Sequence, residues 1–380
     1  LNLFLHDIYH DQEILKAGIV PAQQVLTHEA YLPQMLGHHL KGGIYGQISG
    51  IDIIRDREGE FYVLEDNLRT PSGVSYMLES RKISQKLMPD LCQSNHVLAI
   101  EQYPQLLKQI LAESAYVDNP FIVVLTPGRF NSAYYEHSFL AREMDVPLVS
   151  ARDLFVENDK VYVRTLRGRQ QVDVIYRRVD DAFLDPLCFK ADSTLGVAGL
   201  MSAYLAHNVV ISNAPGTGVA DDKSIYPYVD KMIEYYLNEK PMLKNVPTYQ
   251  CREHNALEYV LENLEKLVVK EAQGSGGYGM LIGPQASQKE IELFRKKLLA
   301  TPHAYIAQPT LDLSVCPTLT DDGMAERHID LRPFVLSSSL RTEIVPGGLT
   351  RVAMQAGSLV VNSSQGGGIK DTWVVDTRRN

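Results

Sequence analysis

Three things are scarce or absent in this sequence of 380 residues, and each argues against a class of protein. Positive charge is outweighed, with 37 Lys and Arg against 46 Asp and Glu. This balance argues against a nucleic-acid partner, whose phosphates require a basic face. No apolar run approaches the roughly 20 residues that span a bilayer, so we expect no membrane role. The longest apolar stretches, such as residues 121–125, indicate buried strands instead.

Cysteine is the third scarce residue, and its four positions (92, 188, 251 and 316) are far apart and form no CxxC pair. This pattern favours reduced thiols in the cytoplasm over a disulfide framework. The chain starts at Leu1 rather than Met, and no signal-peptide pattern follows. We therefore expect a start inside a longer gene product, with an N-terminal segment missing.

The length and patterning predict several domains of α/β type, with α+β mixing. One core rarely grows to 380 residues, so two or three domains are expected. Strands alternate with helical patterns between residues 121 and 237, which predicts a mostly parallel, Rossmann-like sheet. A hairpin of strands at 50–55 and 60–65 precedes this region, and a mixed pattern follows residue 249.

The most informative stretch of the C-terminal half is a glycine loop made of Gly274, Ser275, Gly276, Gly277, Tyr278 and Gly279. It matches GxGxxG, but a dinucleotide fingerprint needs a helix directly afterwards, and residues 280–282 are strand material. A Walker A loop is excluded because no Lys and Ser/Thr follow in the required place. Protein kinases carry their lysine after the loop, whereas Lys270 precedes it.

A strand that ends in lysine, then a glycine loop, then another strand is the order of ATP-grasp enzymes. In those enzymes the lysine neutralises nucleotide phosphates, and the glycine N–H groups close over them. A surface hairpin with an exposed lysine is the alternative that the pattern of residues 267–282 leaves open.

The strongest chemical signal is a set of oxygen ligands on the hairpin. A two-residue turn at Glu58 and Gly59 places Asp52 directly opposite Glu65, and the alternative, a four-residue turn at 56–59, keeps both on the same face. Asn67 shares the face of Glu65 because strand side chains alternate. Like charges directly across a sheet are destabilising, so a positive charge is expected between them. Mg²⁺ fits, since it takes oxygen ligands and shares its octahedron with phosphates. A solvated hairpin with scattered acids is the alternative.

The segment Glu65-Asp-Asn67-Leu-Arg-Thr-Pro-Ser-Gly73 resembles the metal-binding segment of ATP-grasp ligases. In the ordinary family this segment follows the lysine and the glycine loop, whereas here it comes first. That order resembles the circularly permuted ATP-grasp type 2 family, bacterial proteins that are glutathionylspermidine-synthase-like. The strings at 125–128, 131–137, 176–181, 216–223, 327–333 and 361–371 extend the resemblance over nearly the whole chain.

The resemblance implies a circularly permuted ATP-grasp fold with a Rossmann-like pre-ATP-grasp domain. It divides the chain into residues 1–90, a permuted segment of the large lobe with the metal hairpin, and 91–245, the substrate-side domain. Residues 246–325 would be the lid subdomain with the lysine and glycine loop, and 326–380 the remainder of the large lobe. The unit at about 120–240 is expected to stand apart and to present residues 126–132 to the cleft. The strand with Asp330 and Arg332 should lie beside the hairpin.

The resemblance also implies a role for each site residue. ATP phosphates would contact Lys223, Lys270 and the glycine loop at 274–279, with Gln308 near adenine, while Asp52, Glu65 and Asn67 would hold Mg²⁺. Ligases of this class carry an arginine two residues before the first metal acid, where this chain has Gly50. Arg332, Arg69 and Arg55 are the substitutes, and we take Arg332 and Arg69 as the catalytic candidates.

The implied function is an ATP- and Mg²⁺-dependent ligase that joins a carboxylate to an amine through an acyl-phosphate. Its partners would be small-molecule or peptide carboxylate and amine substrates, and an oligomer of identical chains is left open. Two other functions fit the same motifs: a phosphotransferase on this scaffold, and a nucleotide-binding protein without turnover.

Overall fold

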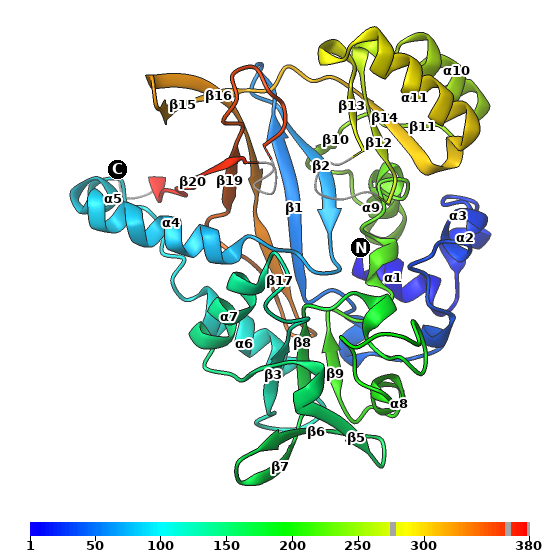
Figure 1. Ribbon diagram of the computed structural model, residues 1–380, viewed down its shortest axis with the longest axis vertical. Coiled ribbons are helices and arrows are strands. Elements are labelled where there is room, and N and C mark those ends of the chain that lie inside the picture. Colours follow the sequence, from blue (N-terminus) through cyan, green and yellow to red (C-terminus); the bar gives the residue numbers. More distant parts are fainter. Residues whose placement is uncertain (274–278, 362–365, 378–380) are drawn as a thin grey trace.

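The computed structural model describes residues 1–273, 279–361 and 366–377, and in this part of the chain the strands form four sheets. The largest sheet lies in the centre of Figure 1, a parallel sheet lies below it, and a helix-covered sheet lies at the upper right. The expected mixed α/β architecture is therefore confirmed. Among the described residues, no helix combines the length and the apolar composition needed to cross a bilayer.

The main sheet has nine strands, and the predicted hairpin lies at its centre. Its strands are β1 (Ile48–Arg55), β2 (Phe61–Asn67), β10 (Lys244–Asn245), β15 (Val315–Thr320), β16 (Gly323–Arg332), β17 (Phe334–Ser337), β18 (Thr342–Ile344), β19 (Leu349–Val352) and β20 (Gly368–Asp371). The order is β10-β2-β1-β16-β19-β20, with β17 paired to β1 and β18, and β15 paired to β16. Ile53 pairs with Leu331 in antiparallel orientation, so β16 lies beside the hairpin as predicted. Two strands alone are marginal in water, and these C-terminal strands complete them.

The parallel sheet confirms the predicted Rossmann-like unit. Its strands are β3 (Ile122–Leu125), β4 (Leu148–Val149), β8 (Val174–Arg177) and β9 (Val210–Ser212), in the order β4-β3-β8-β9. All three pairings are parallel. Every residue of β3 is buried because both faces of this sheet are covered, which explains its continuous apolar sequence.

Helices and a small meander surround the parallel sheet and the main sheet. The helices are α1 (Asn2–Ile8), α2 (Glu13–Lys16), α3 (Ala22–Leu26), α4 (Val74–Leu87), α5 (Pro89–Ser94), α6 (Tyr103–Glu113), α7 (Tyr134–Glu143), α8 (Leu200–Leu205) and α9 (Val229–Leu237). The meander consists of β5 (Leu154–Glu157), β6 (Lys160–Thr165) and β7 (Gly168–Gln171).

The two faces of the parallel sheet belong to different hydrophobic cores. Val123 packs in a core with Phe4 of α1, whereas its neighbour Val124 packs in a core with Phe334 of the main sheet. Successive side chains of a strand point to opposite faces of the sheet, so the parallel sheet contributes to one core on each face. The expectation that the unit at about 120–240 stands apart is therefore wrong. The domain boundaries themselves stay a prediction.

The fourth sheet forms a lid unit, which we define as residues 249–309. It comprises β11 (Tyr249–Gln250), β12 (Leu267–Glu271), β13 (Leu281–Ile282), β14 (Tyr305–Pro309), α10 (His254–Glu262) and α11 (Gln288–Ala300). Val269 of β12 pairs with Leu281 of β13 in antiparallel orientation, so the glycine segment joins two strands, as predicted. Residues 274–278 of that segment lie outside the described residues, and Gly279 is its one described position, at a φ of 68°.

Candidate active site

The hairpin brings the predicted acidic pair together. Asp52 pairs directly with Glu65, and Gly50 pairs with Asn67, which confirms the predicted register at these positions. The amide of Asn67 donates from Nδ2 to the carbonyl oxygen of Gly50 at 3.2 Å. The side chains of Glu65 and Asn67 line one polar cavity.

A β-bulge lies directly beside this pair. Ile53 pairs with Val63, whereas the next pair is Asp52 with Glu65, so Leu64 is an extra residue on β2. The predicted two-residue turn at Glu58 and Gly59 is wrong, because the amide of Asp56 donates to the carbonyl oxygen of Glu60 and the turn comprises residues 57–59. The bulge shifts the register by one residue and so restores the predicted pairing of Asp52 with Glu65. Its consequence is that the successive residues Leu64 and Glu65 both line the same cavity, although strand side chains normally alternate.

Two arginines hold the carboxylate of Asp52, which is 1% exposed. Arg332 donates from Nε to Oδ1 at 2.5 Å and from Nη2 to Oδ2 at 2.7 Å, and Arg351 donates from Nη2 to Oδ2 at 2.6 Å. Burial acts to raise the pKa of Asp52, but the two arginines outweigh burial and hold the pKa below its ordinary value. Arg351 also donates from Nε to Oδ1 of Asp330 at 2.8 Å.

Arg332 supplies positive charge beside the acidic pair, because its Nη2 lies 4.0 Å from Oε1 of Glu65. Among the described residues, no group of three or more His, Cys, Asp or Glu is arranged to hold a metal. Glu65 and Asn67 fit an ion that takes its other ligands from phosphate and water, as Mg²⁺ does. Asp52 has both oxygens engaged by arginine, and its role as a metal ligand stays a prediction.

The three candidate arginines lie in different places. A Cβ built on Gly50 would lie 3.1 Å from Cδ of Arg332, so Arg332 occupies the space beside the position where related ligases carry arginine. Arg55 lies over the ring of Phe61, 5.8 Å from its centroid, near the turn of the hairpin. Arg69 lines the polar cavity together with Glu65 and Asn67.

The two predicted lysines converge on Glu65 from different units. Lys223 Nζ lies 3.3 Å from Oε2 of Glu65, and Lys270 of β12 donates to Oε1 of Gln308 at 2.8 Å. Gln308 in turn donates to Oγ1 of Thr248 at 3.0 Å. Burial lowers the pKa of Lys270 to about 8, and Lys223 adds to this effect while Glu65 opposes it.

Backbone contacts tie the lid unit to the loop of Lys223. The amide of Lys223 donates to the carbonyl oxygen of Ala272, directly beyond β12, at 3.2 Å. Next to it, Asp222 accepts a hydrogen bond from Nε2 of His28 at 2.5 Å. These contacts bring the end of β12, with Lys270, to the loop that carries Lys223.

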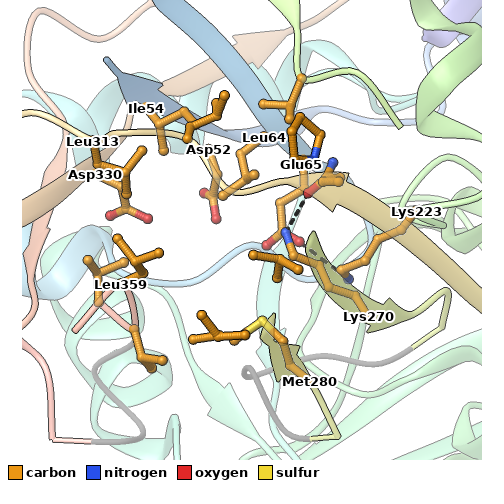
Figure 2. Close-up of a pocket in the computed structure, with 18 of the residues that line it drawn as sticks. Asp52, Ile54, Leu64, Glu65, Lys223, Lys270, Met280, Leu313, Asp330 and Leu359 are labelled. Atoms are coloured by element: carbon orange, nitrogen blue, oxygen red, sulfur yellow. Dashed lines mark hydrogen bonds and ion pairs between the residues drawn. The ribbon is translucent and has the colours of Figure 1, made fainter. Parts of the chain in front are cut away.

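Two unlike cavities meet at the charged residues. The first, of about 170 Å³, is mainly apolar, with walls from Ile54, Leu64, Val246, Met280, Leu313 and Leu359. Figure 2 shows the charged side chains of Asp52, Glu65 and Lys270 among these apolar ones. The second cavity, of about 420 Å³, is polar and is lined by Arg69, Asp180, Asp221 and Arg332, among others. Glu65, Lys223 and Arg351 line both.

Two residues of the segment 126–132, and Arg177, have clear places in the structure. Ser132 lines the polar cavity, whereas Thr126 is buried and bonded to Nδ1 of His137 at 2.9 Å. Arg177 is fully buried and donates to the carbonyl oxygens of Asn213 and Val179, which is a structural role.

Arg351 and Asp221 were not identified from the sequence. Asp221 lines the polar cavity and accepts a hydrogen bond from the amide of Arg69 at 3.0 Å. A basic residue between the apolar Leu349 and Val352 was a signal for Arg351, since a buried arginine requires an acidic partner.

Comparisons with known proteins agree with this geometry. The family described as circularly permuted ATP-grasp type 2 matches residues 1–353. An uncharacterised protein of Mycobacterium tuberculosis is 51% identical over 380 residues, covering 100% of this chain and 69% of that protein. An uncharacterised protein of Synechocystis is 51% identical over 377 residues, covering 99% of this chain and 78% of that protein.

Two further relatives have more informative names. A protein of Frankia casuarinae, provisionally named a glutamate–cysteine ligase, is 42% identical over 379 residues, and the match covers 98% of this chain but 43% of that protein. Among solved structures, a glutathione synthetase-like effector of Globodera pallida in its apo form has a TM-score of 0.56 at 11% identity. That match covers 98% of this chain and 85% of the effector, and it shows a shared fold.

Proposed function

The chain belongs to the circularly permuted ATP-grasp type 2 family, and on this premise we propose that it is an ATP- and Mg²⁺-dependent ligase that joins a carboxylate to an amine. The observation that carries the proposal is the meeting of two unlike cavities at Glu65, Lys223 and Arg351. The apolar cavity suits a nucleotide base and the polar cavity suits two charged substrates. The residues shared by both suit the phosphates between them.

The nucleotide would lie with its base among the apolar walls and its phosphates against Lys223 and Lys270. Gln308, which is buried and bonded to Lys270, lies on the wall of the same cavity and would contact the base side. A triphosphate would relieve the cost of burying the Lys270 ammonium, because an opposite charge favours the charged form. This is a reason for an otherwise costly buried lysine.

Mg²⁺ would be held by Glu65 and Asn67 together with the phosphates, and Asp52 joins this set in the family resemblance. The ion would neutralise the charge that develops on the transferred phosphoryl group. Glu65 is paired with Lys223 in this structure, so Mg²⁺ and Lys223 would share its carboxylate.

The reaction would proceed in two steps. A carboxylate oxygen attacks the γ-phosphorus of ATP, the bond to the bridging oxygen breaks, and ADP leaves the acyl-phosphate behind. The neutral amine then attacks the acyl carbon, and the C–N bond forms as inorganic phosphate leaves and the nitrogen loses a proton. Arg332, oriented by Asp52, would stabilise charge on the phosphoryl oxygens. The lid unit would exclude the water that hydrolyses the intermediate.

The names of the relatives support a ligase rather than fixing its substrates. The Frankia relative is provisionally named for joining glutamate to cysteine, which is a carboxylate–amine ligation. This chain corresponds to 43% of that protein, so the named activity belongs to a longer protein.

The proposal is tested by measuring ADP release with single carboxylates, single amines and their pairs, at saturating Mg-ATP. We expect ADP release to require a carboxylate, to increase with the correct amine, and to yield a hydroxamate when hydroxylamine replaces the amine. A stable phosphorylated product without a C–N bond would identify a phosphotransferase instead. Nucleotide binding without turnover over a broad panel of amino acids, peptides and amines would also contradict the ligase proposal.

A further inference from the structure

The polar cavity contains a guanidinium that forms only long ion pairs with the carboxylates beside it. Nε of Arg69 lies 3.5 Å from Oδ1 of Asp180 and 3.5 Å from Oδ2 of Asp221. This nitrogen is buried and has no hydrogen-bond partner among the described residues, although 37% of the side chain is exposed. The buried Nε is out of the reach of a ligand, but the exposed part of the Arg69 side chain is accessible to a ligand in the cavity that it lines.

The backbone holds Arg69 in this position. Asp221 accepts hydrogen bonds from the amides of Leu68 and Arg69, which fixes the start of the loop after β2. Gly218 provides a flat surface beneath the side chain, because a Cβ at Gly218 would lie 3.5 Å from Cδ of Arg69 and 2.9 Å from Cβ of Ala30. The side chain is therefore directed by its surroundings and does not extend freely into solvent.

Negative charge faces the same cavity. Asp180, with 51% of its side chain exposed, and Glu29 both line it. The neighbouring Asp181 is turned towards Arg177, whose Nη2 lies 2.9 Å from its Oδ1, so Asp181 is engaged elsewhere. One wall of the cavity thus presents a guanidinium next to two carboxylates that are accessible to a ligand.

We propose that this wall binds an α-amino-acid head group, with its carboxylate on Arg69 and its ammonium on Asp180 and Glu29. The proposal rests on the proposed ligase function and identifies one substrate as an amino acid, or a peptide with such a free head group. The planar fork of arginine matches a carboxylate, and a zwitterion satisfies both signs of charge at once. A simple anion would meet the carboxylates of Asp180 and Glu29, and a simple cation would meet the guanidinium of Arg69.

The shape of the cavity orients the bound substrate. Its volume of about 420 Å³ is far above the 10–15 Å³ that one water requires, so it has room for a small molecule. The wall continues from Arg69 through Asn67 to Glu65 and Arg332, at the junction with the apolar cavity. A head group on Arg69 therefore leaves the other end of the substrate at the phosphate side, where the reaction would occur.

The test is calorimetry of the full chain with Mg²⁺ and a non-hydrolysable ATP analogue, with the twenty L-amino acids and γ-glutamylglycine as probes. We expect at least one probe to bind. Its α-amide and its N-acetyl derivative should each bind at least about 10-fold more weakly, since each loses one ionic contact. Absence of binding by every probe, or tighter binding of 1,4-diaminobutane, would overturn the proposal.

Two variants assign each contact. Arg69→Gln should remove the discrimination against the α-amide, and Asp180→Asn should weaken the discrimination against the N-acetyl derivative, with Glu29 retaining part of it. Arg167→Gln and Asp118→Asn, at exposed positions away from the cavity wall, are the matched controls and should retain both discriminations. An equal loss of affinity for all probes in Arg69→Gln would indicate a purely structural arginine and would overturn the proposal.

The same titrations separate this inference from the ligase proposal. If the ATP analogue binds and other carboxylates and amines support ADP release, the ligase proposal stands and the head-group assignment is wrong. If the ATP analogue does not bind to the intact chain, the ligase proposal is wrong, whether or not an amino-acid probe binds.

Discussion

Arg332 crosses the bare Cα of Gly50, and a Cβ built on Gly50 would lie 3.1 Å both from Cδ of Arg332 and from Cβ of Pro71. Since Pro71 is rigid, the side chain of Arg332 would yield first. Gly50→Ala should therefore shift the guanidinium while the hairpin survives, because alanine is compatible with a strand. A displacement of about 1 Å at a reacting group can reduce turnover by about 10²-fold.

The measurement for Gly50→Ala is kcat for ADP release, with nucleotide affinity measured in parallel. We expect kcat to fall and nucleotide affinity to change little. Ser49→Ala, one residue earlier on β1, is the control and should behave as the wild type. Normal kcat in Gly50→Ala would show that the position of Arg332 is unimportant for the reaction.

Arg351→Gln should destabilise the fold more than Arg332→Gln. Arg351 bonds both Asp52 and Asp330, whereas Arg332 bonds Asp52 alone of these two. Removing one partner of a buried ion pair typically costs about 3–5 kcal/mol. In Arg332→Gln this cost is reduced, because Arg351 still bonds Asp52, whereas Arg351→Gln also removes the arginine bonded to Asp330. Urea unfolding of both variants measures the free-energy difference, and the reverse order would contradict the assigned network.

Lys270→Ala should weaken binding of Mg-ATP by about 1–3 kcal/mol, the range for a lost charge-assisted contact. Calorimetry gives the affinity, and Lys266→Ala is the control because that lysine is exposed directly before the same strand. Unchanged affinity in folded Lys270→Ala would remove this lysine from the nucleotide site.

Nucleotide binding should take up a proton above neutral pH. Burial lowers the pKa of free Lys270 to about 8, and a bound triphosphate would raise this pKa by favouring the charged form. Below pH 8, Lys270 is charged in the nucleotide-free protein and in the nucleotide-bound protein. Above pH 8 it is neutral in the nucleotide-free protein and charged in the nucleotide-bound protein. Affinity should therefore fall as the pH rises from 8 to 10.

Calorimetry at pH 8.5 in buffers of different ionisation enthalpy measures this proton uptake. Lys270→Arg should abolish the uptake, since arginine stays charged over this range. Uptake of the same size in Lys270→Arg would assign the proton to a different group.

Glu65→Gln and Asn67→Ala should each abolish turnover at a Mg²⁺ concentration that saturates the wild type, while the fold stays intact. Both side chains line the polar cavity on a strand whose backbone pairing does not need them. ADP release measured against Mg²⁺ concentration tests this, with Glu58→Gln at the exposed turn as the control. A wild-type Mg²⁺ dependence in both variants would exclude this face as the metal site.

Local rules predicted the parts of the molecule that depend on neighbours in the sequence. The strand–loop–strand order around Lys270 followed from residue type. The pairing of Asp52 with Glu65 was predicted from a two-residue turn that the structure lacks, and it is present because the unpredicted bulge at Leu64 compensates for the longer turn. The resemblance to permuted ligases placed β16 beside the hairpin.

The order of strands in the sheets and the packing of the cores could not be predicted from local sequence patterns. Arg351 reaches Asp52 because β19 lies next to β16, and no local pattern specifies that neighbour. Phe4 of α1 belongs to the same hydrophobic core as Val123 of the parallel sheet, although the two residues are more than a hundred positions apart. Such contacts depend on which apolar surfaces remain uncovered, which requires the complete fold.

The bulge at Leu64 predicts the effect of deleting one codon. Loss of this single codon would let the hairpin pair continuously, because the register shifts by one residue at that position. Asp52 would still oppose the glutamate, so the acidic pair would survive the deletion. The apolar cavity would lose one wall residue, and with it part of the surface proposed for the nucleotide base. An in-frame deletion of three nucleotides would thus keep the acidic pair and change the shape of the apolar cavity.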